Sequence, residues 1–462
     1  MHKLILSIVA KLYANRVLAI TPTKRFTYGD IFSSAYELAQ SLKQLKTDTV
    51  ALNTYNSPNH LIGKIAIILS QKIGLYLHPA LGQDKIMAIL EQTHTPWVIE
   101  ETDRGLRLKR YLQSTSTYIK KIPSKTFSLN LSSGTTGLLP KIILHSKLSW
   151  WISTWRIIRY QKRLDNKPVR LLCLPPLATA GSITFLPILL SGGAYVFTGH
   201  QDNPSNELQH LQELIYELQP TQVYITPRQL NKALNQGWWS KPGSVKRVSC
   251  GTEPLLLPTV KKVLDDLGVE LSTGYGMVEC LPPLSSMVIP PGKDVPEGIL
   301  SSAGKILPGV GMKLIEGRLA ISSSTTMLGY LSNSHIDKGD RYRRFFITQD
   351  YGRIKDNYVY IFGRDVDKLG RTTFSRNVEE FILKNISNVI DVAVVKKDEK
   401  EIILALETKQ DIVLKQKLIE QILRQFPELK DKRIALKITN IPLKFTGKLD
   451  RKTILEDSTS DK

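Results

Sequence analysis

The first hundred residues alternate between short apolar segments and longer segments whose apolar residues recur every three or four positions. A short apolar segment bounded by turn residues is typical of a buried strand, and the longer period is typical of a helix. After a helical start and a hairpin around 20–27, the pattern predicts helices at 28–45, 60–70 and 84–93 and strands at 49–53, 73–78 and 96–100. Strands that alternate with helices form a parallel sheet covered on both faces.

The pattern changes twice along the rest of the chain. Strands and helices alternate up to residue 272, residues 296–365 are mostly β, and helices return after Arg364. The expected later elements are strands at 171–176, 222–225, 244–250, 269–272, 389–396, 402–407 and 433–439 and helices at 227–234, 258–267, 377–386 and 413–425. A chain of 462 residues also exceeds the usual size of a single core. We therefore predict an α/β fold with two domains. Residues 1–364 would form a large N-terminal domain of parallel sheets covered by helices, plus a β-rich subdomain, and residues 365–462 a small α+β lid.

Two apolar-rich segments need separate interpretation. The first twenty residues are not typical of a signal peptide, because Lys11 interrupts the apolar run and no clear small-residue cleavage site follows. An amphipathic helix is favoured there, and since no run of 18 apolar residues occurs, we expect no transmembrane segment. Trp150, Trp151 and Trp155 fall near helical spacing, which is more typical of core packing than of a ligand site.

The net charge of +21 raises the question of a polyanionic partner. Lysine and arginine are spread along the whole chain, and neither a zinc-finger spacing nor a basic region with heptads is present, so a solvated basic surface is favoured over nucleic-acid binding. Such a surface is also compatible with an acidic carrier-protein partner. The three scattered cysteines indicate a reducing compartment, and we expect a cytoplasmic protein without a disulfide framework or zinc site.

The segment 129–147 carries the first candidate chemistry. It begins as an apolar strand and then turns through glycines and hydroxyl residues before Pro140 and Lys141. Successive backbone N–H groups in such a turn form an anion-binding nest, to which hydroxyls and a lysine add donors. The predicted phosphate-binding residues are Ser132, Ser133, Gly134, Thr135, Thr136, Gly137 and Lys141. The spacing of a Walker loop is absent, and an ordinary surface turn is the alternative.

The sequence SSGTTG followed by PK resembles the signature loop of the adenylate-forming superfamily, which includes acyl- and aryl-CoA ligases, peptide-synthetase adenylation domains and luciferases. Four further segments resemble motifs of that family and occur in the family's order. They are YGMVE at 275–279, TQD at 348–350, GRDVD at 363–367 and PLKFTGK at 442–448. Each motif alone is weak, but five in order over more than three hundred residues are specific.

The resemblance implies a role for each matching residue. Lys448, on a mobile loop of the lid, would be the catalytic residue, Glu279 would bind Mg²⁺, and Val366 would mark the hinge between the domains. A carboxylate can hold Mg²⁺, a tyrosine can stack on a purine, and one carboxylate can accept hydrogen bonds from two ribose hydroxyls. The implied adenine- and ribose-binding residues are Gly251, Thr252, Glu253, Tyr275, Gly276, Asp350 and Arg364. For Asp350 a hairpin turn at 349–352 is the alternative explanation.

The acid pocket is expected at Ala178, Thr179 and Gly181, where the family often has a histidine or aromatic residue at the position of Ala178. Small side chains would leave room for a bulky or long acid. Residues 174–186 contain no acidic residue, and a buried ammonium without a counter-charge is costly, so an α-amino acid is disfavoured. The sequence favours an aryl or fatty acid.

The implied activity is activation of a carboxylic acid with ATP and Mg²⁺, followed by transfer to the thiol of CoA or of a carrier protein's phosphopantetheine. Several positions depart from the family pattern. The first loop has an additional leucine and lacks the glycine after Lys141, Val278 replaces a threonine, and Val366 replaces the usual Asp or Lys. The segment 368–376 is shorter than usual and lacks a proline, which weakens the prediction of thiol transfer. A catalytically degenerate homologue that binds nucleotide or a partner is the alternative.

Overall fold

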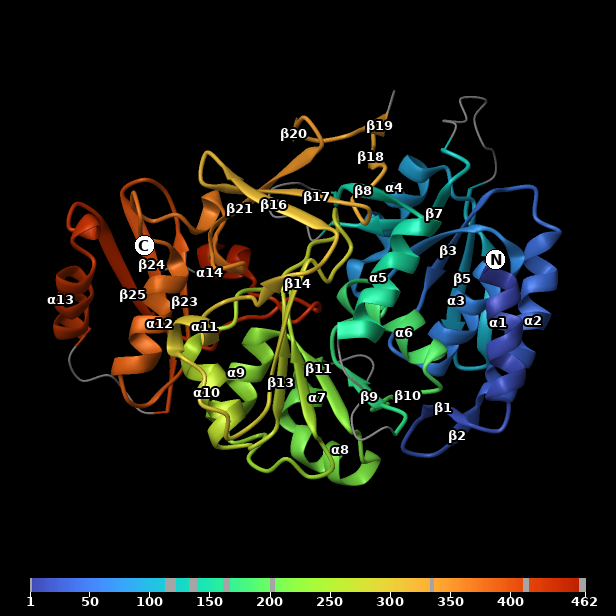
Figure 1. Cartoon of the computed structure of the whole chain (residues 1–462), viewed down its shortest axis with the longest axis horizontal. Coiled ribbons are helices and arrows are strands. Elements are labelled where there is room, and N and C mark those ends of the chain that lie inside the picture. Colours follow the sequence, from blue (N-terminus) through green and yellow to red (C-terminus); the bar gives the residue numbers. More distant parts are fainter. Residues whose placement is uncertain are drawn as a thin grey trace.

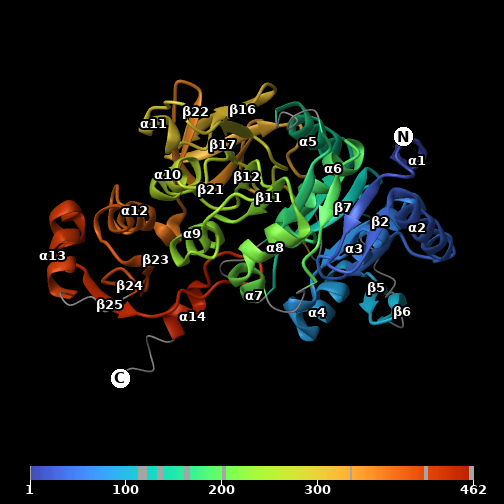
Figure 2. The same ribbon diagram turned by 90° about the horizontal axis from the view of Figure 1, so that it is seen from below.

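The computed structural model describes residues 2–112, 122–132, 139–160, 167–199, 204–332, 336–409 and 415–456. Within these residues the strands form three sheets, and Figures 1 and 2 show two of them side by side under helices, with the third in the C-terminal part of the chain. This arrangement confirms the predicted α/β class. The expected division at 364/365 stays a prediction, although the third sheet uses only residues beyond it.

The eight-stranded sheet has the order β19-β18-β8-β7-β4-β3-β5-β6. Its centre is parallel, as predicted, whereas its edge strands are antiparallel. One strand lies in the segment 101–126, for which only a surface position was expected. The strands are β3 (Thr49–Asn53), β4 (Ile73–Leu77), β5 (Trp97–Thr102), β6 (Gly105–Arg110), β7 (Thr126–Leu131), β8 (Ile142–Ser146), β18 (Gly329–Leu331) and β19 (Ile336–Asp337).

Side-chain caps mark the starts of helices α2 and α3. Thr27 forms a capping box with Asp30 at the start of α2, and Ser57 caps α3 ahead of Pro58. The apolar faces of α2 and α3 pack against each other in the largest core cluster. These helices, with a short 3₁₀ turn, are α1 (His2–Leu12), α2 (Tyr28–Lys43), α3 (Pro58–Ser70), η1 (Pro79–Leu81) and α4 (Gln83–Thr93).

The second sheet has the order β16-β17-β21-β22-β15-β14-β13-β12-β11-β9-β10-β1-β2, with β20 paired to β21. Its parallel part is β1 (Val17–Ile20), β9 (Arg170–Cys173), β10 (Ala194–Val196), β11 (Gln222–Ile225), β12 (Arg247–Cys250) and β13 (Glu270–Thr273), edged by antiparallel β2 (Arg25–Thr27). Its antiparallel part is β14 (Ser285–Ile289), β15 (Lys305–Ile306), β16 (Val310–Ile315), β17 (Arg318–Ser323), β20 (Arg341–Tyr342), β21 (Phe345–Lys355) and β22 (Tyr358–Gly363). The antiparallel part contains most of the segment 296–365 that was predicted to be β-rich, whereas β18 and β19 of that segment belong to the first sheet.

Helices cover this second sheet and fill the space between it and the first. Their apolar residues join the clusters beneath both sheets. They are α5 (Lys147–Tyr160), η2 (Ala180–Thr184), α6 (Phe185–Leu190), α7 (Pro204–Gln209), α8 (Leu211–Leu218), α9 (Pro227–Gln236), α10 (Leu257–Asp265) and α11 (Glu297–Leu300).

The C-terminal part contains its own sheet in the order β23-β24-β25. It has separate core clusters on the two faces of this sheet. Its elements are η3 (Asp365–Asp367), α12 (Ser375–Asn385), β23 (Val389–Lys396), β24 (Glu401–Thr408), α13 (Lys415–Gln425), η4 (Pro427–Leu429), β25 (Arg433–Ile438) and α14 (Arg451–Glu456).

The prediction for the three tryptophans is wrong in part. Trp150 is buried, with 2% of its side chain exposed, whereas Trp155 is 57% exposed. Both lie on α5, and five residues at about 100° each place them roughly 140° apart around the helix, so they cannot share one face. No described helix is long and apolar enough to cross a membrane.

Candidate active site

The candidate site is centred on Asp350, which lies within β21 rather than in a hairpin turn. Its carboxylate accepts a hydrogen bond from the Tyr275 hydroxyl at 2.6 Å and one from Arg364 Nε at 2.8 Å. Burial and then the neighbouring Asp350 raise the pKa of Tyr275, so this hydroxyl remains a donor. Burial opposes the charge of Arg364, but Asp350, together with Glu279 and Tyr275, outweighs burial and raises the guanidinium pKa. These contacts hold the carboxylate in one orientation.

Lys448 reaches the same site from the C-terminal end of the chain. Desolvation lowers the pKa of its ammonium, Arg364 acts in the same direction, and the carboxylates of Glu253, Asp350 and Glu279 oppose the effect. Arg364 and the three carboxylates therefore act on the charge of this ammonium. The structure brings together residues that lie up to 195 positions apart in the sequence.

A short hairpin holds Lys448 in this position. Leu443 and Leu449 pair across it, and its turn contains Gly447 at φ +76°. The Gly447 carbonyl accepts a hydrogen bond from Thr226 Oγ1 at 2.8 Å. At the tip of the hairpin, Phe445 stacks on His78 with ring centroids 4.8 Å apart and planes 16° apart. The tail is thus fixed to the N-terminal part of the chain at two points.

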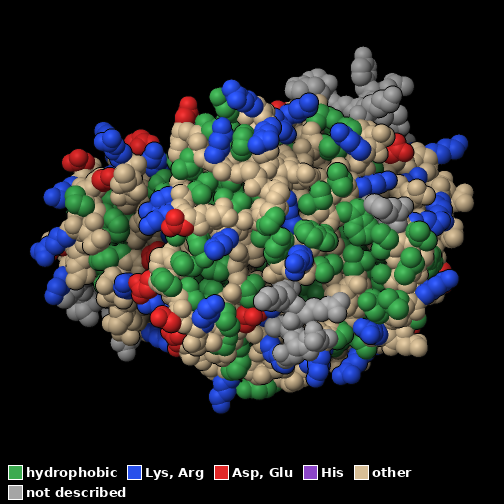
Figure 3. Space-filling model, in the orientation of Figure 1, with side chains coloured by type: hydrophobic (Ala, Val, Ile, Leu, Met, Phe, Trp, Pro, Cys, Tyr) green, Lys and Arg blue, Asp and Glu red, His purple; other side chains and the backbone are tan. Residues whose placement is uncertain are grey.

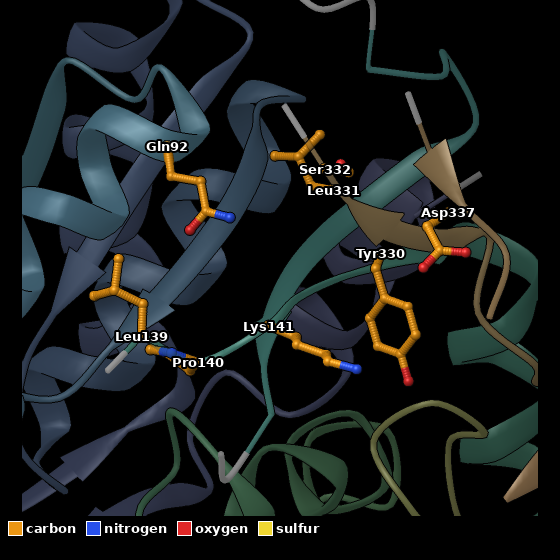
Figure 4. Close-up of a pocket in the computed structure, with 8 residues that line it drawn as sticks. All are labelled: Gln92, Leu139, Pro140, Lys141, Tyr330, Leu331, Ser332 and Asp337. Carbon is orange, nitrogen blue, oxygen red and sulfur yellow. The ribbon is translucent and has the colours of Figure 1, made fainter. Parts of the chain in front are cut away.

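Glu279, the expected Mg²⁺ ligand, is connected to Lys141 through the side chain of Tyr330. Tyr330 donates to Glu279 Oε1 at 3.1 Å, and the Lys141 ammonium lies 4.8 Å from the centre of the Tyr330 ring. Figure 4 shows Lys141 and Tyr330 directed into one hollow of about 480 Å³, whose wall also includes Asp337. The remaining lining residues are Gln92, Leu139, Pro140, Leu331 and Ser332.

Most of the predicted phosphate loop, residues 133–137, lies outside the described residues. The described residues at its two ends are paired with each other. Ser132 N–H donates to the Lys141 carbonyl at 3.0 Å, and Lys141 N–H donates to Ser132 Oγ at 3.0 Å. Both ends of the loop therefore start from the antiparallel pair β7–β8, which opens toward the hollow.

The predicted adenine loop 251–253 contains two buried polar atoms without a hydrogen-bond partner among the described residues, Thr252 Oγ1 and Glu253 Oε2. Buried polar atoms are nearly always paired in folded proteins. Thr252 also has φ +84°, which a non-glycine residue rarely adopts. Unpaired atoms in a strained loop fit a site that a polar ligand completes.

Gly276 has a steric reason to be glycine. A Cβ atom at this position would lie 2.2 Å from Pro282 Cβ, so any larger residue would displace the loop that carries Tyr275 and Glu279. Packing alone therefore accounts for this residue.

The predicted acid pocket is more enclosed than small side chains suggest. Ala178 is buried in the core cluster, and a Cβ on Gly181 would lie 2.7 Å from the Pro175 carbonyl oxygen. Asn56 fixes this segment by donating to the Cys173 carbonyl at 3.0 Å and accepting from Leu177 N–H at 2.7 Å. The pocket assignment stays a prediction.

Next to this segment lies Lys64, a buried lysine that sequence reasoning missed. Its ammonium donates to Ser182 Oγ at 2.6 Å and lies 4.5 Å from the ring centre of Tyr76 and 4.8 Å from that of Phe185. No carboxylate pairs with it among the described residues. Desolvation lowers its pKa from 10.5 to about 7. The signal in the sequence is a single charge within an apolar helical run.

A second missed feature is the polar face that α9 turns toward the C-terminal part. Arg228 pairs with Glu379 at 2.6 Å and with Asp391 at 3.1 Å, and all three side chains are largely buried. Desolvation raises the pKa of Asp391 to about 6, although Arg228 acts in the opposite direction. Lys232 adds an ion pair to Glu407 at 3.0 Å. Partners more than 150 residues apart give no signal in one sequence.

The predicted hinge residue, Val366, is 38% exposed in η3. Its neighbours are tied to both parts of the chain, because Tyr351 donates to Asp365 at 2.9 Å and Arg451 of α14 pairs with Asp367. The role of the hinge stays a prediction.

The donor set around Glu279 is compatible with magnesium. No group of three His, Cys, Asp or Glu side chains that could hold a metal by itself occurs in the described part of the chain. Magnesium that is bound with a nucleotide needs only one or two protein carboxylates, since phosphates and water complete its shell. Glu279 meets that requirement.

Comparisons with known proteins agree with this geometry. A family model described as "AMP-binding enzyme" matches residues 7–331. A curated relative, the putative long chain fatty acid-CoA ligase VraA of Staphylococcus aureus, is 21% identical over 381 residues, covering 80% of this chain and 78% of the relative.

Solved structures share the fold along almost the whole chain. O-succinylbenzoate CoA synthetase (MenE) from Bacillus subtilis, in complex with AMP, has a TM-score of 0.76 at 17% identity and 97% coverage of both chains. Anthranilate CoA ligase AuaEII, in complex with anthranoyl-AMP, has a TM-score of 0.78 at 20% identity, covering 99% of this chain and 96% of its own. Amide bond synthetase McbA from Marinactinospora thermotolerans has a TM-score of 0.77 at 18% identity, covering 99% of this chain and 100% of its own. Since the family match includes well over half of the chain, this protein belongs to the AMP-binding enzyme family.

Proposed function

We propose that this protein activates a carboxylic acid with ATP, forming an acyl- or aryl-adenylate and pyrophosphate, and then transfers the acyl group to a thiol. The observation that supports the proposal is the buried Asp350 carboxylate, which Tyr275 and Arg364 orient and whose charge acts on the Lys448 ammonium. The family match and the CoA ligases among the similar proteins support the same reaction class.

In the first step a carboxylate oxygen attacks the α-phosphorus, a P–O bond forms, and the bond to the bridging oxygen of pyrophosphate breaks. Negative charge accumulates on the phosphoryl oxygens, so the reaction needs positioned cations more than a general base. The Lys448 ammonium would meet this need by lying between the incoming carboxylate and the α-phosphate. Mg²⁺, held through Glu279, would neutralise phosphate charge. Asp350, oriented by Tyr275 and Arg364, would bind the ribose hydroxyls.

The decisive assay is acid-dependent exchange of labelled pyrophosphate into ATP, over a panel of aryl and fatty acids. Lys448→Ala should lower exchange by at least about a hundredfold while nucleotide binding persists, because the ammonium acts on the transition state. Lys444→Ala is the matched control, since Lys444 lies on the same hairpin outside the charged cluster. Equal exchange by the Lys448 and Lys444 variants would contradict the proposed role.

The group that accepts the acyl chain remains to be identified. CoA or a phosphopantetheinylated carrier protein is our first expectation, and a solved amide bond synthetase of the same fold adds amines to the panel. The alternative, a catalytically degenerate homologue, rests on Val278, Val366 and the short segment 368–376. Acid-dependent exchange with any member of the panel would exclude it, and nucleotide binding without exchange would support it. We place the protein in the cytoplasm, consistent with its three buried free cysteines.

A further inference from the structure

Two helices expose apolar side chains in regular rows. On α1 the exposed residues follow one another every four positions, so they form one stripe along the helix. On α5, Leu148 and Trp155 lie roughly opposite buried Trp150, and Ile158 lies on the flank of the helix. The exposed side chains, with their exposed fractions, are Leu4 (66%), Ile8 (54%), Leu12 (67%), Leu148 (62%), Trp155 (57%) and Ile158 (39%).

This concentration is not the scattered exposure common on protein surfaces. Twelve large hydrophobic side chains are exposed in the described part of the chain, and half of them lie on α1 and α5, which have only 11 and 14 residues. Contiguous apolar patches mark surfaces that bind something, whereas single exposed residues need no explanation.

The two helices lie on the same side of the molecule. Leu6 and Val9 of α1 and Trp150 of α5 belong to one core cluster, which both helices cover. In Figure 3 hydrophobic side chains gather over the area that Figure 1 labels α5, α6 and α1. The exposed rows are therefore parts of one face, which we call the α1/α5 face.

The charge of this face restricts its partner. Neither helix contains an acidic residue, and the exposed basic residues Lys3, Lys11, Lys147 and Arg159 flank the apolar rows. Leucine, isoleucine and tryptophan combined with lysine and arginine are typical of helices that lie in the interface of an anionic membrane. A second copy of this chain would carry the same basic face and a net charge of +21, which opposes self-association.

We propose that the α1/α5 face binds the surface of an anionic lipid bilayer. The apolar side chains enter the boundary between headgroups and acyl chains, Trp155 lies at headgroup level, and the lysines and arginines contact lipid phosphates. The attachment is peripheral, in keeping with the lack of a spanning helix among the described elements. It does not depend on the proposed adenylation activity.

The test is sedimentation of the full chain with vesicles of equal parts phosphatidylglycerol and phosphatidylcholine, and with vesicles of phosphatidylcholine alone. Binding to the anionic vesicles is expected, weakening between 50 and about 500 mM salt, with negligible binding to the neutral ones. Trp155 should shift its fluorescence to shorter wavelength on binding. It is the most exposed of the six tryptophans, and a Trp155→Phe variant identifies its contribution.

Two variants remove apolar area from the face without touching the core. Leu4→Ser with Ile8→Ser on α1, and separately Leu148→Ser with Ile158→Ser on α5, should each lower vesicle partitioning at least about tenfold. Leu314→Ser with Tyr342→Ser is the matched control, because these side chains are similarly exposed (42% and 47%) but lie on the β-rich subdomain. Melting temperatures verify that each variant is folded.

Three outcomes would overturn the proposal. The first is no binding to anionic vesicles, or equal binding to neutral ones. The second is partitioning that the α1 and α5 variants retain. The third is a dimer, seen by sedimentation velocity, that the α1 or α5 variants dissociate, because a second copy would then occupy the face.

Discussion

Lys64 provides a prediction in which a single substitution stabilises the protein. Lys64 is 2% exposed, and its ammonium has one hydrogen bond and no carboxylate partner among the described side chains. Lowering a lysine pKa from 10.5 to about 7 corresponds to about 4 kcal/mol of lost stability at pH 7, since each pKa unit is worth about 1.4 kcal/mol. Lys64→Met keeps the aliphatic stem and removes the charge. The Ser182 hydroxyl loses a donor, at a cost of about 1 kcal/mol, so the expected net gain is about 3 kcal/mol.

The pH dependence of the stability difference between Lys64→Met and the wild type gives a second, sharper test. Between pH 7 and about 10 the unfolded chain binds a proton at Lys64 that the folded protein has released, so the stability of the wild type rises with pH. The advantage of Lys64→Met should therefore shrink by up to about 1.4 kcal/mol per pH unit across this range. Chemical unfolding at pH 7 and pH 9.5 measures both quantities.

Lys72→Met is the control, because Lys72 lies just beyond the end of α3 and donates to the backbone carbonyls of Leu45 and Thr47. Removing these hydrogen bonds should destabilise the protein by about 1–3 kcal/mol. A destabilised Lys64→Met protein, or an advantage that does not change with pH, would refute the reasoning that the charge is uncompensated.

Three further predictions concern the candidate site. Tyr275→Phe removes a hydrogen bond to Asp350 and should raise the KM for ATP in the exchange assay by about tenfold, with a smaller change in kcat; an unchanged KM would count against Asp350 as the ribose ligand. Gly447→Ala places a Cβ 2.6 Å from the Gln229 side chain at φ +76°, so exchange should fall at least about tenfold while equilibrium nucleotide binding changes little. Arg228→Met leaves two buried carboxylates without their cation, and cleavage by a protease between the two parts of the chain should accelerate.

The sequence was most informative where a hydrophobic pattern or a recognisable motif lies within a short segment of the chain. Strand β3 and strand β23 begin and end where the apolar pattern predicts, because each is a short run bounded by turn residues. The ordered motifs also predict that Lys448 and Asp350 share a site; the Asp350 charge acts on Lys448, and the shared role stays a prediction. These features depend on residues that are close in sequence or that occur in a recognisable order.

Features that depend on angles or distant partners were not predictable. Trp155 follows the helical spacing but lies about 140° from Trp150, so the same pattern includes one buried and one exposed indole. The partners of Arg228 are 151 and 163 residues away, and the chain gives no local sign of them. Lys64 could have been noticed as a lone charge in an apolar helix, but its aromatic surroundings come from three separate elements.

The polar face of α9 has a consequence for how the C-terminal part could move. Its side chains Arg228, Asn231, Lys232, Asn235 and Gln236 contact that part through ion pairs and hydrogen bonds. The charged groups of this interface would regain hydration on separation, and the polar face of α9 would expose little apolar surface. The free-energy cost of separating them would therefore be small. The arrangement with this interface formed and the arrangement with it separated would then differ little in free energy. A bound nucleotide or thiol would need only a modest preference for one of them to decide which predominates.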